Sequence, residues 1–392
     1  EDDIPDKYQI TFTYVSADDD KGTVTGTTSE IATVYEIFTD SETGEITDVG
    51  RPIPQHPTQP STVTPKDGYR FEKWQQDDLT FFNSDDELRN SEYLEDQTFI
   101  AHFTVRRDLH YEIHYFYEDA NGVVTEDTAA AIVSDIGVFG EKILTTTVPK
   151  ESEFNGKHYV LERIEGADKQ VGLDPDENIV NVYYSIDVIG KEDPDKPDNI
   201  PDKYQITFTY VSADANKGTV TGTTKEVVTT YEITRDSVTG EIIVGNGPTA
   251  QHPTQPSTVT AKAGYKFDKW TDEDQKSFDD DAALKAASYL EDQTFTAHFI
   301  ATEQTYRVKY LDEDKNVEIR DMSDPRDAHF GDEIKGYTEK IEISGYTFVR
   351  ADDLTVGTDN EQNIVNVYYS EDTNEDDIPD KYQITFTYVS AD

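Results

Sequence analysis

The chain has 392 residues, of which 82 are Asp or Glu and 34 are Lys or Arg, so its formal net charge is −48. With no cluster of Lys and Arg, this charge argues against nucleic acid and anionic membrane surfaces as partners, because both are polyanions. The absence of Cys excludes a disulfide framework and a thiolate metal site. No apolar run approaches the roughly 18 residues of a membrane-spanning helix, so we expect no direct membrane insertion.

The opening stretch, Tyr8–Asp18, occurs three times and returns letter for letter at Tyr204–Asp214 and Tyr382–Asp392. Its Tyr, Ile and Phe residues alternate with polar ones, which predicts a β-strand with one buried face. Each copy is therefore interpreted as the first strand of a module. We expect residues 382–392 to be the stub of a further module, and to be unpaired, because an isolated strand cannot bury its apolar face.

The first two copies each open a long module, here called an A module, and the two A modules align without a gap. In chain order the first one shows a hairpin turn near Gly44, a proline-flanked segment 55–64 that suits an edge strand or an extended crossing, and a strand over 69–74. Ser84 followed by Glu87 forms a capping box that predicts a short helix over 85–93. In the second A module Asp279 or Asp280 is the expected cap. A strand over 98–103 closes the module.

Shorter units, here called B modules, follow the A modules. Each begins with a Tyr-rich strand that runs into an acidic turn. Each ends in the same eight residues, Asn-Ile-Val-Asn-Val-Tyr-Tyr-Ser, which start at Asn178 and at Asn363. The composition then changes to acidic, proline-containing segments that we expect to be stiff, extended linkers.

These observations predict an α+β chain, mostly β, made of small modules in tandem in an elongated, monomeric string. The expected divisions are an A module at 1–105, a B module at 106–187, a linker at 188–203, an A module at 204–302, a B module at 303–371, a linker at 372–381 and the stub at 382–392. Only a few residues join each A module to its B module, so closer coupling is expected there.

The B modules resemble the MucBP module of mucus-binding surface proteins of Gram-positive bacteria. The resemblance rests on the Tyr-rich first strand with its acidic turn, on Gly345–Val349 and on the terminal Asn363–Tyr369. In the A modules, Gly68–Trp74 and the closing strand are similar to the Listeria/Bacteroides repeat and to stalk domains of cell-wall adhesins. The middle of the A module is longer than in that repeat, which leaves its strand order open. The resemblance implies β-grasp (ubiquitin-like) modules, display outside the cell on the bacterial surface, and binding of mucin or immunoglobulin.

Candidate catalytic and metal-binding residues are few, and we expect no enzyme and no resident cofactor. Histidines such as His56 and His102 have no Ser nucleophile or paired carboxylate nearby in the sequence, and solvated strand histidines explain them. Calcium is the one cofactor considered, because Asp174, Asp176 and Glu177 offer oxygen ligands; without EF-hand spacing, a solvated turn is the alternative. Wall adhesins often join Lys to Asn covalently, which makes Lys309 and Asn366 a candidate pair. The first B module has His114 in place of Lys309, which argues against it.

Repeated aromatic residues are the candidates for ligand binding. Trp74 and Trp270 could stack on sugar faces, or anchor the core of their modules. In the pairs Tyr183/Tyr184 and Tyr368/Tyr369, neighbouring side chains point to opposite faces of a strand, so one of each pair is expected to be exposed. Exposed tyrosine suits wet, polar recognition surfaces.

Two functions fit this pattern. The modules could bind a host glycoprotein, mucin or immunoglobulin, with low affinity per copy raised by multivalency. Alternatively, they could be spacers that project a different binding domain away from the cell wall.

Overall fold

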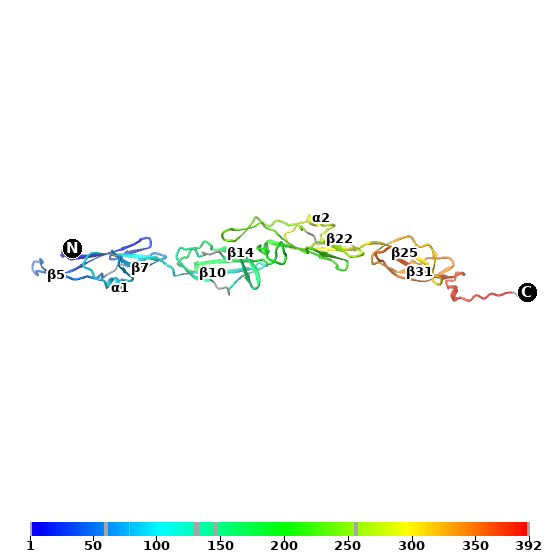
Figure 1. Ribbon diagram of the computed structural model, residues 1–392, viewed down its shortest axis with the longest axis horizontal. Coiled ribbons are helices and arrows are strands. Elements are labelled where there is room, and N and C mark those ends of the chain that lie inside the picture. The colour runs from blue at the N-terminus through cyan, green and yellow to red at the C-terminus, as the bar shows by residue number, and fades with distance from the viewer. Residues whose placement is uncertain are drawn as a thin grey trace. The chain divides into compact units, whose positions relative to one another are not determined.

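The computed structural model describes residues 2–58, 62–77, 79–128, 133–143, 148–254 and 258–389. Contacts divide the chain into two units. Unit 1 comprises residues 1–186 and 235–243, and unit 2 comprises residues 187–234 and 244–392. The chain is mostly β, as the alternating pattern predicts (Figure 1). The described residues form many short strands, two short α-helices and five 3-10 helices.

The four modules share one sheet plan. In each, the first long strand and the last one lie side by side and run parallel, and antiparallel strands flank this central pair. The pairs are β1 with β9, β10 with β15, β16 with β24, and β25 with β31. A long connection separates the two strands of each pair, as parallel pairing requires. The strand order that the sequence left open for the first A module is β3-β1-β9-β7-β8.

The A modules add a pair of two-stranded sheets to this plan, β2 with β6 and β4 with β5 in the first copy, and β17 with β21 and β19 with β20 in the second. The elements of the first copy are η1 Asp6–Tyr8, β1 Gln9–Ser16, β2 Gly22–Thr25, β3 Ser29–Thr33, β4 Tyr35–Thr39, β5 Ile46–Pro52, β6 Thr62–Pro65, β7 Tyr69–Gln76, β8 Phe81–Phe82, α1 Asp85–Arg89 and β9 Gln97–Val105. Those of the second are η3 Asp202–Tyr204, β16 Gln205–Ser212, β17 Gly218–Thr221, β18 Lys225–Thr229, β19 Ile233–Arg235, β20 Ile242–Val244, β21 Thr258–Ala261, β22 Tyr265–Thr271, β23 Ser277–Phe278, α2 Asp281–Lys285 and β24 Gln293–Ala301.

The B modules pair their first strand with two short strands on its outer side. The elements of the first copy are β10 Leu109–Glu118, β11 Val124–Glu126, β12 Val133–Gly137, β13 Glu151–Phe154, β14 Lys157–Glu165, η2 Pro175–Glu177 and β15 Ile179–Ile186. Those of the second are β25 Glu303–Asp312, β26 Val317–Arg320, β27 Arg326–His329, β28 Glu333–Ile334, η4 Gly336–Glu339, β29 Tyr346–Ala351, β30 Leu354–Thr355 and β31 Ile364–Glu371; η5 Asp380–Tyr382 follows.

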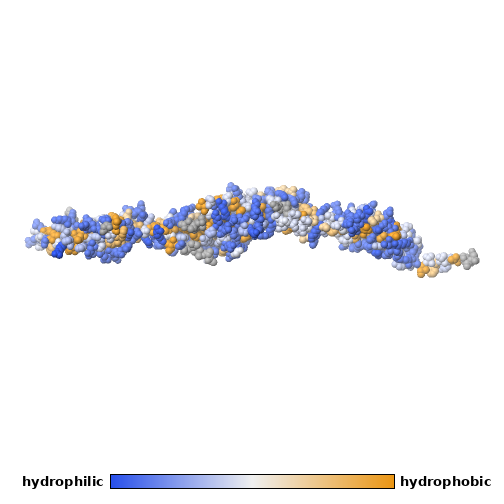
Figure 2. Space-filling model, in the orientation of Figure 1, coloured by the Kyte–Doolittle hydropathy of each residue, from blue (hydrophilic) through white to orange (hydrophobic). Residues whose placement is uncertain are grey.

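Each module has its own hydrophobic cluster, formed by the inward-facing residues of these strands. In β1 the residues Ile10, Phe12 and Tyr14 are buried and the residues between them are not, which confirms the predicted alternation. The corresponding cluster of the second A module contains Ile206, Phe208 and Tyr210. Most of the visible surface is hydrophilic, with smaller hydrophobic areas scattered along it (Figure 2). A surface of this kind fits the large negative charge.

The capping signals predict where the helices begin but not where they end. The Ser84 hydroxyl accepts a hydrogen bond from the Glu87 amide, and α1 begins at Asp85 as predicted. It ends at Arg89 rather than near residue 93, and Tyr93 instead forms a β-bridge with Gln55. In the second copy the cap is Asp280, whose side chain accepts from the Ala283 amide.

Within each unit, the A module meets its B module at a glycine. Gly68 has φ +82°, and a Cβ atom there would lie 2.1 Å from the ring of Phe139 in the B module. Gly264 has φ +84°, and its Cβ would lie 2.4 Å from the ring of Phe330. Glycine is therefore required twice over at this junction, by its backbone conformation and by the close approach of the ring.

The acidic segments after the B modules differ from the extended linkers that their composition predicts. In unit 2, the buried Asp187 carboxylate accepts hydrogen bonds from the amides of Asp198 (3.1 Å) and Asn199 (2.8 Å), and Asp202 accepts from Val188 (2.9 Å). Carboxylates that bind backbone amides offset the charge repulsion that would otherwise extend the segment.

Tyr382, the first residue of the stub, ends the 3-10 helix η5, and the other described residues of the stub, 383–389, form no strand. The apolar residues of the stub are exposed, with Phe386 at 75%. The expectation of an unpaired stub is confirmed for these residues. Residues 390–392 lie outside the described part of the chain.

Candidate ligand-binding face of the B modules

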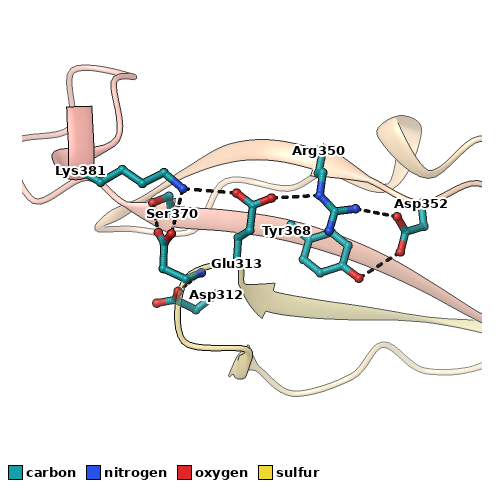
Figure 3. A network of polar contacts seen from close by, with 8 residues as sticks. Asp312, Glu313, Arg350, Asp352, Tyr368, Ser370 and Lys381 are labelled. Carbon is teal, nitrogen blue, oxygen red and sulfur yellow. Dashed lines mark hydrogen bonds and ion pairs between the residues drawn. The ribbon is translucent and has the colours of Figure 1, made fainter. Parts of the chain in front are cut away.

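The outward face of the second B module carries a tyrosine covered by an arginine. Tyr368 lies on β31 and is partly exposed, and the Arg350 guanidinium carbon lies 3.7 Å from the centroid of its ring. The Tyr368 hydroxyl donates to Asp352 over 3.0 Å, and Arg350 Nη1 donates to the same carboxylate over 2.7 Å (Figure 3). The three side chains thus hold one another in a single geometry.

A β-bulge places the arginine over the ring. On β29 the register with β31 shifts between Phe348, which faces Tyr369, and Arg350, which faces Tyr368. A bulge re-aims the side chains that follow it. Residue 350 consequently shares the outward face with Tyr368.

Acidic and polar groups extend this face toward the end of the module. Glu313 accepts from Arg350 Nε over 2.9 Å and pairs with Lys381 over 3.3 Å (Figure 3). Asp314 accepts from Ser370 Oγ over 2.7 Å and pairs with Lys381 over 2.9 Å. The Ser370 hydrogen bond, followed by the Lys381 ammonium, lowers the pKa of Asp314, so this carboxylate remains charged at neutral pH.

The first B module repeats the same constellation. The Arg163 guanidinium lies 3.7 Å from the centroid of the Tyr183 ring, and the Tyr183 hydroxyl donates to Glu165 over 3.2 Å. A bulge between Leu161 and Arg163 again aligns the arginine with the tyrosine. Burial and the Glu165 carboxylate raise the pKa of Tyr183, so its hydroxyl stays protonated.

The outward face carries more aromatic side chains in the first B module than in the second. Phe116 stacks on Tyr183 with centroids 4.9 Å apart, and His114 lies beside Phe116 at 6.4 Å. Hydrogen bonds join His114 to Glu126 (2.7 Å) and Glu112 (2.9 Å). The second copy has Leu311 opposite Tyr368 and a Lys309–Glu318 ion pair in the place of His114.

This arrangement offers a partner aromatic area and charged hydrogen-bonding groups without a deep pocket. Arginine and tyrosine are the residue types enriched where proteins contact one another. Because the polar groups are already held by their neighbours, little side-chain freedom is lost on binding. The face therefore has the composition and order of a recognition surface.

The other aromatic candidates lie inside the modules. Trp74 and Trp270 are fully buried, and their indole nitrogens donate to Asp85 (2.8 Å) and Asp281 (2.9 Å). These rings are core anchors, the alternative considered above, and have no face open to a ligand. Tyr184 and Tyr369 are also buried, and their hydroxyls donate to the carbonyls of Pro149 and Ile341, each over 2.8 Å. Of each tyrosine pair, only the first member reaches the surface.

The oxygen-rich turn of the first B module is held by its own backbone. Asp174 caps the 3-10 helix η2 and accepts from the Asp176 amide over 3.0 Å, while Asp176 and Glu177 are exposed. Among the described residues, no group of three or more acidic or histidine side chains is arranged to hold a metal ion.

The candidate cross-linking pair is adjacent in register but accessible. Lys309 lies opposite Asn366 across the parallel β25–β31 pair, and its ammonium lies 2.7 Å from Glu318. The Lys309 side chain is 31% exposed. These residues lie on the same outward face as Tyr368.

A polar hollow of about 950 Å³ adjoins the edge strand β18 in unit 2. Its lining includes Lys191, Asp195, Glu226, His252 and Thr254. Glu226 is engaged by the amide of Thr254 (3.1 Å), and His252 Nδ1 lies 2.7 Å from the Ala287 carbonyl. Each of these two groups thus has a local structural role, and their contacts do not form a nucleophile–base pair.

Sequence reasoning missed the two arginines and their acidic partners. A signal was present, because Arg163 and Glu165, like Arg350 and Asp352, stand two residues apart at corresponding places in the two copies. It also missed the role of Asn178 and Asn363, the first residues of the repeated terminal strand. Each is buried and holds a glycine loop and the first strand through its side-chain amide.

Comparison with known proteins places part of the chain near a family. Residues 36–106, less than a fifth of the chain, match the model of the Divergent InlB B-repeat domain, a bacterial surface repeat family. No curated protein matches the chain. None of the described helices has the length and apolar character needed to cross a membrane. All but the last residue of the match lies in the first A module, and the match is consistent with a surface-associated repeat region.

Proposed function

We propose that this chain is a non-enzymatic repeat region of a bacterial surface adhesin that binds a host glycoprotein, mucin or immunoglobulin. The observation that carries the proposal is the Tyr–Arg–acid constellation that both B modules present on their outward faces. The family match in the first A module supports display at the bacterial surface.

The chemistry of the two faces indicates which part of a glycoprotein they would contact. Tyr183 and Tyr368 supply ring faces, and the neighbouring carboxylates make the surroundings negative. On a chain of net charge −48, such faces repel sialylated or sulfated sugars. Neutral sugars and the polypeptide of the partner are therefore the favoured contacts.

The affinity of one face is expected to be low, because one partly exposed ring and its neighbours cover little area. Two faces on one chain raise the apparent affinity for a ligand that repeats along its own length. Mucins and immunoglobulins displayed on a surface satisfy that condition.

An array of mucins, other glycoproteins and immunoglobulins tests this proposal. The full chain should bind a subset of them, and the double variant Tyr183→Ser, Tyr368→Ser should lose that binding. The matched control is Tyr337→Ser, since Tyr337 is 62% exposed in the second B module but is not part of the constellation. Equal binding by the double variant and the wild type would refute the assignment of the face.

A spacer role is the second candidate, and the glycine junctions favour it. Phe139 packs against the turn at Gly68 and Phe330 against the turn at Gly264, so each A–B pair is joined by a close contact as well as by the chain. If the full chain binds nothing on the array, the spacer role is favoured.

We also propose that the modules are β-grasp units and that the B modules are of the MucBP type. The central parallel pair formed by the first and last strands, with antiparallel strands on both sides, supports this assignment. An experimental structure of one A–B pair compared with ubiquitin-like folds would test it.

A further inference from the structure

The segment that follows the second B module is docked on that module. Lys381 reaches Asp314 over 2.9 Å and Glu313 over 3.3 Å, across 67 and 68 residues of sequence (Figure 3). Glu313 also accepts from Arg350, so the docked lysine joins the network of the Tyr368 face. Through these contacts, the end of the B module binds the Lys381 ammonium.

A buried carboxylate at the end of β31 holds the same segment by its backbone. Asp372 is 3% exposed and accepts from the amides of Asp376 (3.2 Å) and Asp377 (2.9 Å). Its own amide donates to the Gly345 carbonyl over 2.8 Å, which ties it to the turn before β29. In return, Asp380 accepts from the Thr373 amide over 3.2 Å. Asp372 and Thr373 thus supply an acceptor and a donor, and residues 376–380 supply donors and an acceptor in turn.

The docked segment has the same internal shape in all three of its copies. Asp2, Asp198 and Asp376 each accept a hydrogen bond from the amide two residues later, at Ile4 (3.2 Å), Ile200 (3.0 Å) and Ile378 (3.0 Å). A single-turn 3-10 helix, η1, η3 or η5, follows each time. The lead-in segment, as we name residues 376–382 and their two other copies, is therefore a locally formed unit.

The contacts of the third copy are made by residues of the lead-in segment itself. Lys381 and Asp380 make the contacts above, while residues 383–389 form no strand and expose Ile384 and Phe386.

We infer that Glu313 and Asp314 at the acidic end of the B module, with Asp372 directly after β31, form a binding site for the lead-in segment, which reads Asp-Asp-Ile-Pro-Asp-Lys-Tyr at 2–8 and 376–382 and has Asn199 in place of the second Asp at 198–204. The folded B unit then extends to Tyr382, and the start of the following strand is held in place before that strand pairs. The segment acts as a joint of defined geometry instead of a free linker. This inference is independent of the proposed function, since it holds for an adhesin and for a spacer.

Amide hydrogen exchange on the full chain tests the inference, with the amides of Thr373, Asp376 and Asp377 as reporters. In the wild type these amides should be protected relative to an unstructured peptide. Asp372→Asn should raise their exchange about tenfold or more, because it removes a buried charged acceptor of two amides. Lys381→Ala should raise it by a smaller factor, a few-fold, because its ion pairs are partly exposed.

The control is Lys335→Ala, which removes an exposed ion pair with Asp353 in the same module (2.9 Å) and should leave the reporter amides unchanged. The amides of β25 and β31 show whether each variant keeps its fold. Reporter amides that exchange in the wild type as fast as those of a free peptide would overturn the inference. So would reporter amides that neither Asp372→Asn nor Lys381→Ala affects while β31 stays protected.

Discussion

At the scale of single residues, the repeated asparagines show how one side chain can organise a module. Asn363 is 2% exposed, accepts from the Gly357 amide over 2.8 Å, and donates to the carbonyls of Gly357 (3.1 Å) and Thr305 (3.2 Å). It thereby joins the loop before β31 to the start of β25. Asn178 makes the equivalent contacts with Gly172 and His110.

Replacing Asn363 with Ala should destabilise the second B module by about 3 kcal/mol, because three hydrogen bonds are lost and their buried partners are left unsatisfied. Hydrogen exchange of the β25 and β31 amides in the full chain measures this as a roughly hundredfold increase. Asn366→Ala, on the same strand but half-exposed, is the control and should cost less than about 0.5 kcal/mol. Equal effects of the two substitutions would contradict the anchoring role.

His114 makes the first B module sensitive to pH. Burial opposes its charge, but hydrogen bonds to Glu112 and Glu126 outweigh burial and raise its pKa above the ordinary 6.5. A raised pKa in the folded state means that the stabilisation is present below 6.5 and is lost as pH rises through the folded value. We expect the β10–β11 pairing to loosen as pH rises from 6.5 through the raised pKa of His114.

Exchange of the β10 and β11 amides, corrected for its intrinsic pH dependence, measures the loosening. The second copy of the module supplies the matched variant, since Lys309 stands in the place of His114. His114→Lys keeps a positive charge throughout this range and should abolish the effect. If His114→Lys shows the same pH dependence as the wild type, another group is responsible.

At the scale of elements, local patterns in the sequence predict strands and caps well and contacts between strands poorly. The alternation in Tyr8–Asp18 predicts β1 and its buried face, and Ser84 predicts the start of α1. α1 ends at Arg89, and Tyr93, which the sequence predicts to be helical, pairs with Gln55, a contact that no local signal records. The bulges at Arg163 and Arg350 are likewise set by strand register. The sequence therefore predicts the tyrosines of the candidate face but not the arginines that cover them.

One added methyl group can disrupt the junction between an A and a B module. Gly264→Ala places a Cβ 2.4 Å from the Phe330 ring at a φ of +84°. The ring must move, and the junction hydrogen bonds, from the Thr302 amide to Gly264 and from the Phe330 amide to Thr302, should weaken. We expect these two amides to exchange at least tenfold faster.

Gly345→Ala is the matched control for this substitution. Gly345 has nearly the same φ, +81°, but a Cβ there would meet no atom within 4 Å. Gly345→Ala therefore introduces the backbone strain without the clash, so the Thr302 and Phe330 amides should keep their wild-type protection. An unchanged junction in Gly264→Ala would show that the Phe330 contact does not hold the two modules together.

At the scale of the whole molecule, the repeat is the feature that the sequence predicts most directly. Identical stretches mark the modules, and net charge argues against polyanionic partners. Composition misleads at the acidic linkers, because it records the charges of Asp187 and Asp372 but not the backbone amides that these carboxylates bind. Composition also does not identify the ligand, since it does not distinguish an exposed tyrosine from a buried one.

We propose that the two B-module faces are binding sites that act together. Surface plasmon resonance on a glycoprotein or immunoglobulin selected from the array measures this, with wild type, Tyr183→Ser, Tyr368→Ser and the double variant. On a densely coated surface, each single variant should lose roughly 10- to 100-fold in apparent affinity and the double variant should not bind. On a sparsely coated surface, the wild type and the single variants should differ only about twofold. Wild-type binding by the double variant would contradict the claim.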